Sequence, residues 1–493
     1  TARLAHEVTA PPTFPVRLSG HVERLERRAK GDRILLRRDD APVHGLAHPP
    51  DLVRLTLRKG WAPPVGTHIT QLARLLPPLG PAMPGAHDFG RGPWFQGIGA
   101  VGYGLGRPKL TPQEAPAPLS VRFAAAVDGV RQDLAGRIRA VLSGVPAEIA
   151  VALVAGDRSA IPFEVEEGMR VSGLTHILSI SGLHMALVVG TLFALVRGGL
   201  ALVPALALGF PIKSLAAGLA LLGGAAYLVL SGNEVPAQRS FVMAALVLLG
   251  VAVGRPALTL RTVAVAGVVV LTLTPEAVLE AGTQMSFAAT LALIAAYERL
   301  RPLRAFRRPD SMVLRVPLMV AIFFGGVALT SLVAGLATAP YAVFHFQRAA
   351  PYGLLANLAA MPAVSLLVMP FGLLGVLLLP FGWDGIAWPV MGAGIEIMMT
   401  VSDKVAALPG ADMRVGVMGV GTLLCLSLAL LCLCLLRGTL TFLAVLPLAA
   451  APLLAPAPFR PDVLVAPNAA TVGVRGPDGR LSLIGAPTHR LMA

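Results

Sequence analysis

Four polar side chains lie within nine residues of an otherwise apolar segment: His176, Ser179, Ser181 and His184. Polar groups are unfavourable in the hydrocarbon of a bilayer, and they usually face a protein interior or a water-filled path. On a continuous helix His176, Ile180 and His184 recur every four residues and share one face. The segment therefore predicts a membrane helix with a polar stripe, and a polar substance that is handled inside the membrane.

Ser181 and His184 also have the composition of a serine hydrolase centre. A serine nucleophile needs a base within hydrogen-bond reach and a site that binds the oxyanion. A serine three residues before a histidine lies near it on a helix, but serine and glycine also pack membrane helices closely. We favour packing, assign no catalytic residue, and leave enzymatic activity on this chain uncertain.

Asp157 and Arg158 form a second polar group, just before Pro162 and a run of glutamates. An aspartate ahead of a proline and acidic residues is typical of the start of a helix. We therefore expect this pair to cap a helix that begins after Ser159.

Further polar residues lie inside or beside apolar segments. Gln238 and Arg239 follow Ser231, and an arginine at a membrane boundary either binds phosphate through two parallel hydrogen bonds or snorkels to lipid headgroups. Gln284 and Asn357 either line a hydrophilic path or form hydrogen bonds across helices.

The chain lacks several motifs of energy-coupled or metal-dependent enzymes. It has no Walker-type phosphate loop, so an ATP motor of that type is excluded. Its ten histidines are scattered, without the clustered spacing of a two-metal hydrolase centre. We predict no metal site and no cofactor.

Composition indicates an integral membrane protein. Of 493 residues, 55% are hydrophobic and 14% are charged, whereas a soluble domain has about 25% charged residues. The net charge is +14, and residues 1–120 contribute half of it, with 16 Lys and Arg against 9 Asp and Glu. This excess suits nucleic acid or anionic headgroups, or only solubility and orientation. Cys425, Cys432 and Cys434 share one apolar run and indicate packing residues rather than disulfides.

We predict an α-helical polytopic membrane protein with an N-terminal small β-barrel (OB-like) soluble domain. That domain spans residues 1–115 and is expected outside the cytoplasm. Several short strands within about 100 residues suit the five-stranded oligonucleotide/oligosaccharide-binding barrel. The strands are predicted from alternating residues at 16–22, 33–38, 52–57 and 67–75.

Residues 77–106 are rich in glycine and proline and contain Trp94, Phe95 and Tyr103. Beside Arg91 and Arg107, these aromatic rings either stack on bases or fix a loop to its own domain.

Residues 116–172 are predicted to link the barrel to the membrane. Within them, 119–144 has apolar residues at helical spacing opposite several arginines. Such an amphipathic helix either lies on a membrane surface or packs against the helical bundle.

Residues 173–458 form the predicted polytopic transmembrane domain. Arginines concentrate in the loop 298–309, and positive loops stay cytoplasmic. Counting back from it places the barrel outside, provided that 198–211 is re-entrant and does not cross the membrane. The predicted spans are near 174–196, 212–231, 237–254, 259–275, 277–298, 313–336, 350–380 (one long or two short), 415–436 and 439–457.

Residues 459–493 are predicted to be a soluble tail, the stub of a further domain. Strand-like segments lie at 462–466 and 471–475, and two strands do not fold alone. The chain starts at Thr1, and no signal peptide precedes the basic domain. We therefore expect it to be part of a longer chain.

Several motifs resemble those of the ComEC family, the membrane channel proteins of bacterial natural competence. The resemblance covers residues 15 to 475, and its most specific part is His176-Ile-Leu-Ser-Ile-Ser-Gly-Leu-His184. The other matching stretches are Ala155-Gly-Asp-Arg-Ser159, Ser231-Gly with Gln238-Arg-Ser240, Gly282-Thr-Gln-Met-Ser-Phe287, Asn357-Leu-Ala-Ala-Met-Pro362, Pro84-Gly-Ala-His-Asp-Phe89 and Gly97-Ile-Gly-Ala-Val-Gly-Tyr103.

The resemblance implies passage of single-stranded DNA across the bacterial inner (cytoplasmic) membrane during natural transformation, by a multi-pass protein. It implies as partners the lipid bilayer, a DNA receptor outside and a helicase or translocase ATPase inside, with a homo-oligomer as a further possibility. Many family members end in a metallo-β-lactamase-like domain, whose metal motif this chain lacks. The alternatives are a membrane-bound nuclease or hydrolase and a small-solute transporter.

A polyanion that crosses hydrocarbon needs a hydrated and preferably basic path. We predict that the basic barrel concentrates DNA and that polar residues of the helical part line the path. The candidates are Asp157, Arg158, His176, Ser179, Ser181, His184, Gln238, Arg239, Gln284 and Asn357.

Overall fold

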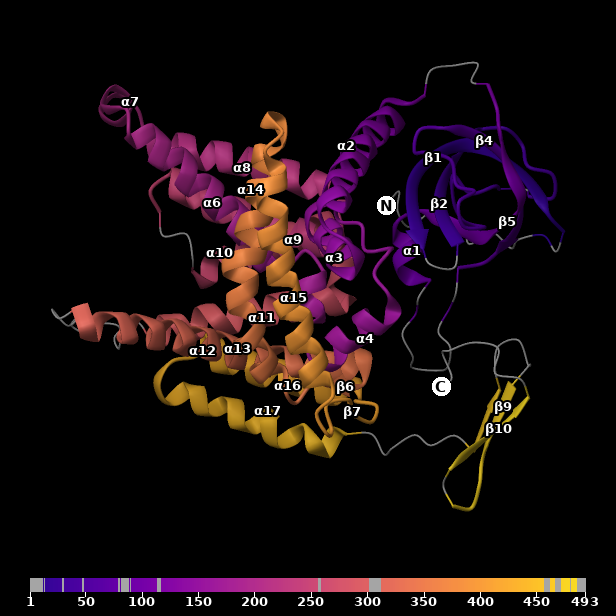
Figure 1. Cartoon of the computed structure of the whole chain (residues 1–493). Coiled ribbons are helices and arrows are strands. Elements are labelled where there is room, and N and C mark those ends of the chain that lie inside the picture. The colour runs from indigo at the N-terminus through magenta and orange to yellow at the C-terminus, as the bar shows by residue number, and fades with distance from the viewer. Residues whose placement is uncertain are drawn as a thin grey trace.

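A computed structural model shows a β-barrel beside a body of helices, with helix α2 (Leu119–Val141) between them (Figure 1). The structure describes residues 12–455 except 13, 29–30, 47, 79, 81–87, 89, 113–116, 256–258 and 301–311, together with 462–465, 471–478 and 480–485. Most of the arginine-rich loop 298–309 and most of the stretch 84–89 therefore lie outside the described residues.

The N-terminal strands close into a barrel, as the sequence predicted. Among the described residues the strand order is β1-β2-β3-β5-β4, and β3 runs parallel to β5 while the other neighbours are antiparallel. Apolar residues at every second position fill the interior, including Leu18, Ile34 and Leu55. The strands are β1 (Val16–Arg28), β2 (Gly31–Arg38), β3 (Leu52–Leu57), β4 (His68–Leu76) and β5 (Ile98–Leu110).

Strand β5 was missed because its glycines hide the alternation. The backbones pack so closely that a Cβ at Gly102 would stand 2.4 Å from the carbonyl oxygen of Arg74. Glycine in a strand often marks such an approach. Trp94 and Phe95 lie in the short helix α1 (Arg91–Phe95) and contact each other edge to face, at 4.7 Å between ring centroids.

The amphipathic segment forms α2 and packs between barrel and body. Its buried residues Leu134, Ala135 and Ile138 belong to the main core of the helical body. On the barrel side, Arg27 donates a hydrogen bond to Gln132 at 3.3 Å. This packing favours the linker interpretation of the segment. The linker continues in α3 (Gly144–Ala155) and α4 (Phe163–Val171).

The remaining helices form the apolar body, whose core includes the fully buried Trp388 and Ile149. In chain order they are α5 (Thr175–Leu178), α6 (Gly182–Ala201), α7 (Pro204–Gly209), α8 (Ile212–Leu230), α9 (Val235–Ala252), α10 (Leu260–Leu273), α11 (Ala281–Arg299), α12 (Met312–Phe346), α13 (Gly353–Ala363), α14 (Met369–Leu378), α15 (Ala387–Ala406), α16 (Val420–Leu435) and α17 (Val445–Ala450).

Six helical segments of the described chain are long and apolar enough to cross a membrane. The segment predicted at 350–380 is one of them, continuous through a π-helical turn at Val364–Val368. The six are Gly182–Ala201, Ile212–Leu230, Val235–Ala252, Pro317–Phe346, Gly353–Phe381 and Asp384–Ala406.

Asp384–Ala406 was missed, because its acidic residues and Lys404 interrupt the apolar run. Asp384 is nevertheless buried and accepts a hydrogen bond from Trp388 Nε1 at 3.0 Å. Conversely, the spans predicted at 259–275, 415–436 and 439–457 are shorter apolar helices. The stretch 198–211 contains the end of α6 and the short helix α7.

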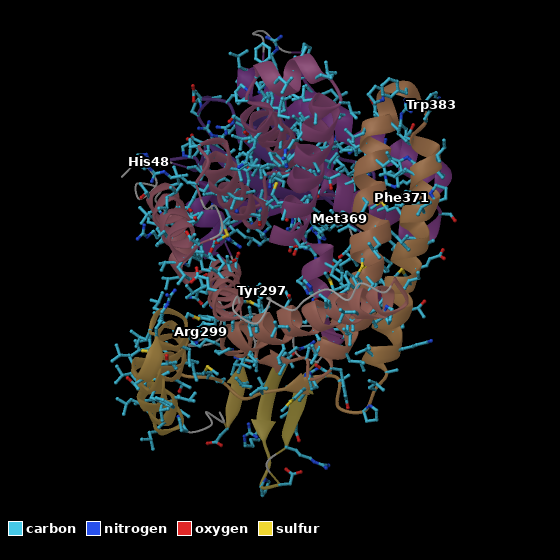
Figure 2. All side chains as sticks on the ribbon, turned by 90° about the vertical axis from the view of Figure 1, so that its left-hand side faces the viewer. His48, Tyr297, Arg299, Met369, Phe371 and Trp383 are labelled. Atoms are coloured by element: carbon cyan, nitrogen blue, oxygen red, sulfur yellow. The ribbon has the colours of Figure 1, made fainter. Side chains whose placement is uncertain are left out.

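The tip of the α14–α15 hairpin carries exposed aromatic rings. Phe381 and Trp383 are 68% and 64% exposed, and Trp383 lies at one end of the body in Figure 2, beyond Met369 and Phe371. Aromatic residues are enriched at membrane–water interfaces. The tip therefore has the composition of an interfacial anchor.

The tail forms a small sheet, and the loops of the body add a short strand pair. Strands β8 (Val463–Val465), β9 (Thr471–Arg475) and β10 (Leu481–Gly485) pair antiparallel, which adds one strand to the two that the sequence predicted. Strands β6 (Arg348–Ala349) and β7 (Met413–Arg414) join two loops of the body.

Candidate functional site

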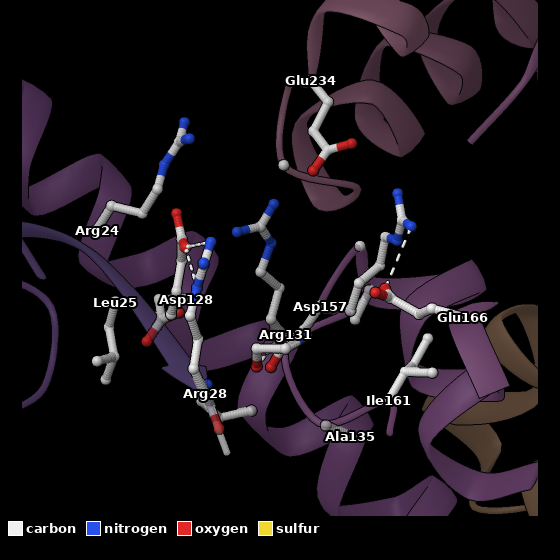
Figure 3. A pocket seen from close by; sticks show the side chains of 17 residues that line it. Arg24, Leu25, Arg28, Asp128, Arg131, Ala135, Asp157, Ile161, Glu166 and Glu234 are labelled. Atoms are coloured by element: carbon white, nitrogen blue, oxygen red, sulfur yellow. Dashed lines mark hydrogen bonds and ion pairs between the residues drawn. The ribbon is translucent and has the colours of Figure 1, made fainter. Parts of the chain in front are cut away.

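A polar cleft of about 440 Å³ lies where the barrel, α2 and the helical body meet. We call it the junction cleft, and Figure 3 shows its side chains. Its described lining residues come from β1, α2, the 155–161 loop, α4 and the α8–α9 turn. They are Arg24, Leu25, Glu26, Arg28, Asp128, Arg131, Gln132, Ala135, Ala155, Gly156, Asp157, Arg158, Ser159, Ile161, Glu166, Gly232 and Glu234.

Two of the motifs found in the sequence contact each other at this cleft. Gly156 has φ +76°, and a Cβ there would stand 2.1 Å from the carbonyl oxygen of Ser231. Only glycine combines the left-handed backbone with so close an approach. Arg131 of α2 donates to the carbonyl oxygens of Leu230 at 2.6 Å and Val229 at 3.3 Å, which satisfies the end of α8.

Asp157 and Arg158 do not cap α4 as we expected. Asp157 accepts hydrogen bonds from the backbone N–H of Ser159, at 3.0 Å, and from its hydroxyl, because a short acidic side chain readily folds onto its own loop. The residue that precedes α4 is Pro162, and the acidic residues do lie in its first turn. Arg158 lines the cleft and lies 3.4 Å from Glu166.

Charges in the junction cleft are mixed. Its described lining has the arginines Arg24, Arg28, Arg131 and Arg158 against Glu26, Asp128, Asp157, Glu166 and Glu234. Burial raises the pKa of Glu234, and the nearby Arg158 and Arg24 oppose that rise. Burial also raises the pKa of Asp128, against the effect of Arg131. The cleft is therefore polar and nearly balanced rather than a strong anion site.

Positive charge dominates on the outer face of strands β1, β2 and β3. Arg24, Leu35 and Arg54 lie opposite one another across the three strands, and Arg33 lies two residues further along β2, opposite Glu26 and Thr56. We call Arg24, Arg28, Arg33 and Arg54 the arginine face. Burial lowers the pKa of Arg54, and the charge of Arg33 lowers it further; the pKa of Arg33 is lowered by burial and by Arg28.

Few acidic groups compensate this arginine face. Glu26 lies 2.7 Å from Arg28 and 3.7 Å from Arg33, so one carboxylate serves two cations. Arg54 reaches the neutral amide of Gln96 at 3.5 Å. On the adjoining strand β5, Tyr103 pairs with Thr56 and is 57% exposed. The face thus offers cations beside an aromatic ring, and Arg24 and Arg28 extend it into the junction cleft.

The predicted continuous helix through His176 and His184 is wrong. Helix α5 ends at Leu178, Ser179 and Ser181 are extended, and α6 begins at Gly182. Ser181 and His184 form a capping box: the backbone N–H of Ser181 donates to His184 Nδ1 at 3.2 Å. A serine followed three residues later by an acceptor favours a helix start, so the chain breaks where a stripe was expected.

This capping geometry also bears on the idea that Ser181 and His184 form a nucleophile and its base, because the contact to His184 comes from the backbone of Ser181. The Nδ1 atom of His184 is occupied by a backbone N–H, and His184 is 1% exposed. His176 Nδ1 lies 3.1 Å from the carbonyl oxygen of Gly173, and the Ser179 hydroxyl donates to the carbonyl oxygen of His176 at 3.2 Å. These contacts stabilise the turn between α5 and α6.

Arg239 is buried inside the helical body. Its side chain is 5% exposed and lies 3.5 Å from Glu280, and its Nε has no hydrogen-bond partner among the described residues. A Cβ at Gly282 would stand 2.8 Å from Arg239 Nη2. The absence of a side chain at Gly282 therefore leaves space for the guanidinium group of Arg239, which belongs to a different motif.

The remaining candidates are dispersed. The side-chain amide of Gln238 donates to the carbonyl oxygen of Asn233 at 2.8 Å. Gln284 Oε1 lies 2.8 Å from His345 Nε2, and this contact links α11 to α12. Asn357 has a buried side-chain oxygen without a described partner. The candidates thus fall in separate parts of the fold: the junction cleft, the α5–α6 turn, and scattered positions in the body.

Sequence reasoning missed the arginine face. The signal was present, because Arg33 and Arg54 occupy outward positions of predicted strands. What a single sequence did not show is which strands become neighbours, and only that pairing brings arginines from three strands together.

Comparisons with known proteins point in one direction. The family described as "Competence protein" matches residues 153–440. The chain is 27% identical over 232 residues to ComE operon protein 3 of Bacillus subtilis (strain 168), covering 47% of this chain and 26% of that protein. It is 40% identical over 144 residues to Competence protein ComA of Neisseria gonorrhoeae, covering 29% of this chain and 20% of that protein. No solved structure matches.

Proposed function

Because the chain belongs to the ComEC family of competence proteins, we propose that it passes single-stranded DNA across the bacterial inner membrane during natural transformation. The matched segments cover about a quarter and a fifth of the two relatives, so the substrate and direction are our inference. The helices suited to crossing a membrane support a multi-pass membrane protein.

The arginine face of the barrel is the observation that carries this proposal. Nucleic acid binding depends on cations that neutralise phosphates, and single strands add stacking of bases on aromatic rings. Arg33 and Arg54 repel each other electrostatically in the free protein. A bound phosphate relieves that repulsion, and Tyr103 on the neighbouring strand is exposed to a base.

The junction cleft offers single-stranded DNA a route from the barrel toward the helical body. Arg24 and Arg28 belong to both the arginine face and the cleft, whose lining also includes Arg158. A cleft of balanced charge suits a moving polyanion, because strong binding there would hold the strand in place. The cleft is therefore proposed as a passage between the two parts of the molecule and the barrel as the place of capture.

Other parts of the function remain predictions. They are the pathway role of His176, Ser179, Ser181, His184, Gln238, Arg239, Gln284 and Asn357, the receptor outside, the ATPase inside, and a homo-oligomer. The buried positions of Arg239 and His184 suggest that these two act by holding helices in place.

An uptake assay with fluorescently labelled DNA tests the proposal. The double variant R33Q/R54Q is expected to lower both cytoplasmic DNA and transformant number, because two phosphate contacts are lost. The matched control is R17Q, which removes an exposed arginine at the other end of β1. Membrane levels of each variant are measured by immunoblot. Unchanged uptake by R33Q/R54Q at normal protein levels would refute the arginine face as the DNA contact.

A further inference from the structure

Three side chains at the closing edge of the barrel have the chemistry of a metal site. We propose that His21, Asp39 and His68 bind one zinc ion, a site that departs from our sequence-based expectation of no metal. The inference does not depend on the proposed DNA function.

Barrel closure brings the three residues together. His21 of β1 and His68 of β4 are directly paired across the strands, and their ring centroids are 4.8 Å apart. Asp39 directly follows β2, and its Oδ2 lies 2.8 Å from His68 Nε2. Each residue offers one ligand atom, and the three atoms lie within 4.8 Å of one another. Donors around a tetrahedral zinc ion are about 3.3 Å apart, so small side-chain rotations suffice.

Unsatisfied nitrogens at this place independently indicate a ligand. His21 is 8% exposed, and its buried Nε2 has no hydrogen-bond partner among the described residues. His68 Nδ1 is buried without a described partner as well. An unsatisfied buried polar atom is unfavourable by about 1–3 kcal/mol. A metal ion bound to His21 Nε2 removes that penalty, whereas the His68–Asp39 contact alone does not.

The surrounding charge permits a cation. Arg37 lies opposite His21 on β2, but it is paired with Glu23 at 3.0 Å. The carboxylate of Asp39 is therefore available to a cation, because Arg37 forms its ion pair with Glu23. The side chain of Asp39 is 35% exposed, which leaves an approach from solvent to an otherwise covered site.

Ligand chemistry selects zinc among common ions. Imidazole nitrogens suit zinc and related transition metals, whereas calcium and magnesium prefer oxygen ligands. Three protein ligands leave a fourth position for water. The ion would join β1, β4 and the end of β2, and so clamp the edge where the barrel closes.

Metal content of the purified full chain in detergent micelles tests this site. After treatment with a chelator, the protein is loaded with Zn²⁺, dialysed and analysed by mass spectrometry for zinc. About one zinc per chain is expected, together with the visible absorption bands of a tetrahedral site when Co²⁺ replaces zinc. Competition with a chromophoric chelator then gives the affinity.

Single substitutions identify the ligands. H21A, H68A and D39N are each expected to weaken zinc binding by at least about 100-fold, since even indirect partners of a metal contribute 10–100-fold. H44A is the control, an exposed barrel histidine outside the cluster. D39N preserves the size of a partly exposed side chain, so it tests the site if H21A fails to fold. Less than one tenth of a zinc per wild-type chain, or equal binding by D39N and wild type, would overturn the proposal.

Discussion

The arginine face of the barrel and the arginines Arg131, Arg137 and Arg239 of α2 and the helical body occupy different kinds of environment. In α2, Arg131 is bound to the end of α8 and Arg137 lies 3.1 Å from the buried Asp384; in the body, Arg239 lies 3.5 Å from Glu280. On the barrel, Arg28 and Arg33 share Glu26, and Arg54 meets a neutral amide.

This difference distinguishes arginines that can bind a ligand from arginines that stabilise the fold. Arg131 is held by the carbonyl groups of α8 and Arg239 is buried inside the body, so both stabilise the fold and offer little to a phosphate. Arginines that repel one another across three strands favour an external anion. The comparison predicts that substitutions in the body act first on stability, and that substitutions on the barrel act first on DNA affinity.

The largest effect is expected from R239A. The substitution leaves an empty space beside Glu280 and removes the charge that compensates its carboxylate. Because the side chain of Glu280 is 38% exposed, the loss of stability should stay below the value of about 3–5 kcal/mol expected for a fully buried pair. The thermal midpoint of the protein in detergent should fall by several degrees. R197A, at an exposed part of α6, is the control and should change little. If R239A keeps the wild-type midpoint and loses DNA binding, the division between body and barrel fails.

R33Q/R54Q should weaken binding of single-stranded DNA by about tenfold and leave the thermal midpoint unchanged. Each lost phosphate contact reduces the dependence of log affinity on log salt by about 0.7 for single strands. Titration of labelled oligonucleotide by fluorescence anisotropy at several salt concentrations measures both quantities. A weaker affinity with an unchanged salt slope would show that these arginines do not contact phosphates.

Y103A is expected to weaken the same binding by about fivefold, equivalent to about 1 kcal/mol, near the lower limit for loss of one stacked base. Because stacking does not involve ion release, the salt slope should remain that of wild type. Y103F keeps the ring and should bind normally. Equal losses for Y103A and Y103F would assign the effect to the hydroxyl group instead.

The smallest effect is expected in the junction cleft, from E234Q. Burial raises the pKa of the Glu234 carboxyl group. The folded protein therefore binds a proton at this carboxyl group more firmly than the unfolded chain does. The charged form is therefore unfavourable at neutral pH, and the penalty disappears as pH falls through the raised pKa. E234Q should stabilise the neutral-pH protein by less than about 1 kcal/mol. Thermal midpoints measured between pH 7 and pH 5 should then depend less on pH; a stronger dependence would contradict this account.

Local patterns predicted much of the fold. The alternation of apolar and polar residues identified four barrel strands, and the length of the apolar segments identified most helices of the body. Both signals depend only on residues that are close in the sequence. Two errors arose where a local pattern competed with tertiary contacts. The 174–196 helix breaks at Ser179 because Ser181 and His184 form a capping box. The span at Asp384–Ala406 looked too polar, yet Asp384 is satisfied by Trp388 and Arg137.

The site was harder to predict than the fold. Asp157 and Arg158 line the junction cleft, but the cap expected of them does not form, and their part in a DNA path stays a prediction. Arg33, Arg54 and the cluster of His21, Asp39 and His68 join residues from separate strands. Their proximity depends on the closed strand order, which no spacing along the sequence encodes.

Helix α2 is attached to both parts of the molecule at adjacent residues. Gln132 accepts a hydrogen bond from Arg27 of the barrel, and Arg131 holds the last carbonyl groups of α8. With 23 residues, α2 is about 35 Å long and resists bending. Because these two contacts are one residue apart on α2, a displacement of the barrel relative to α2 would act next to the residues that hold the α8–α9 turn.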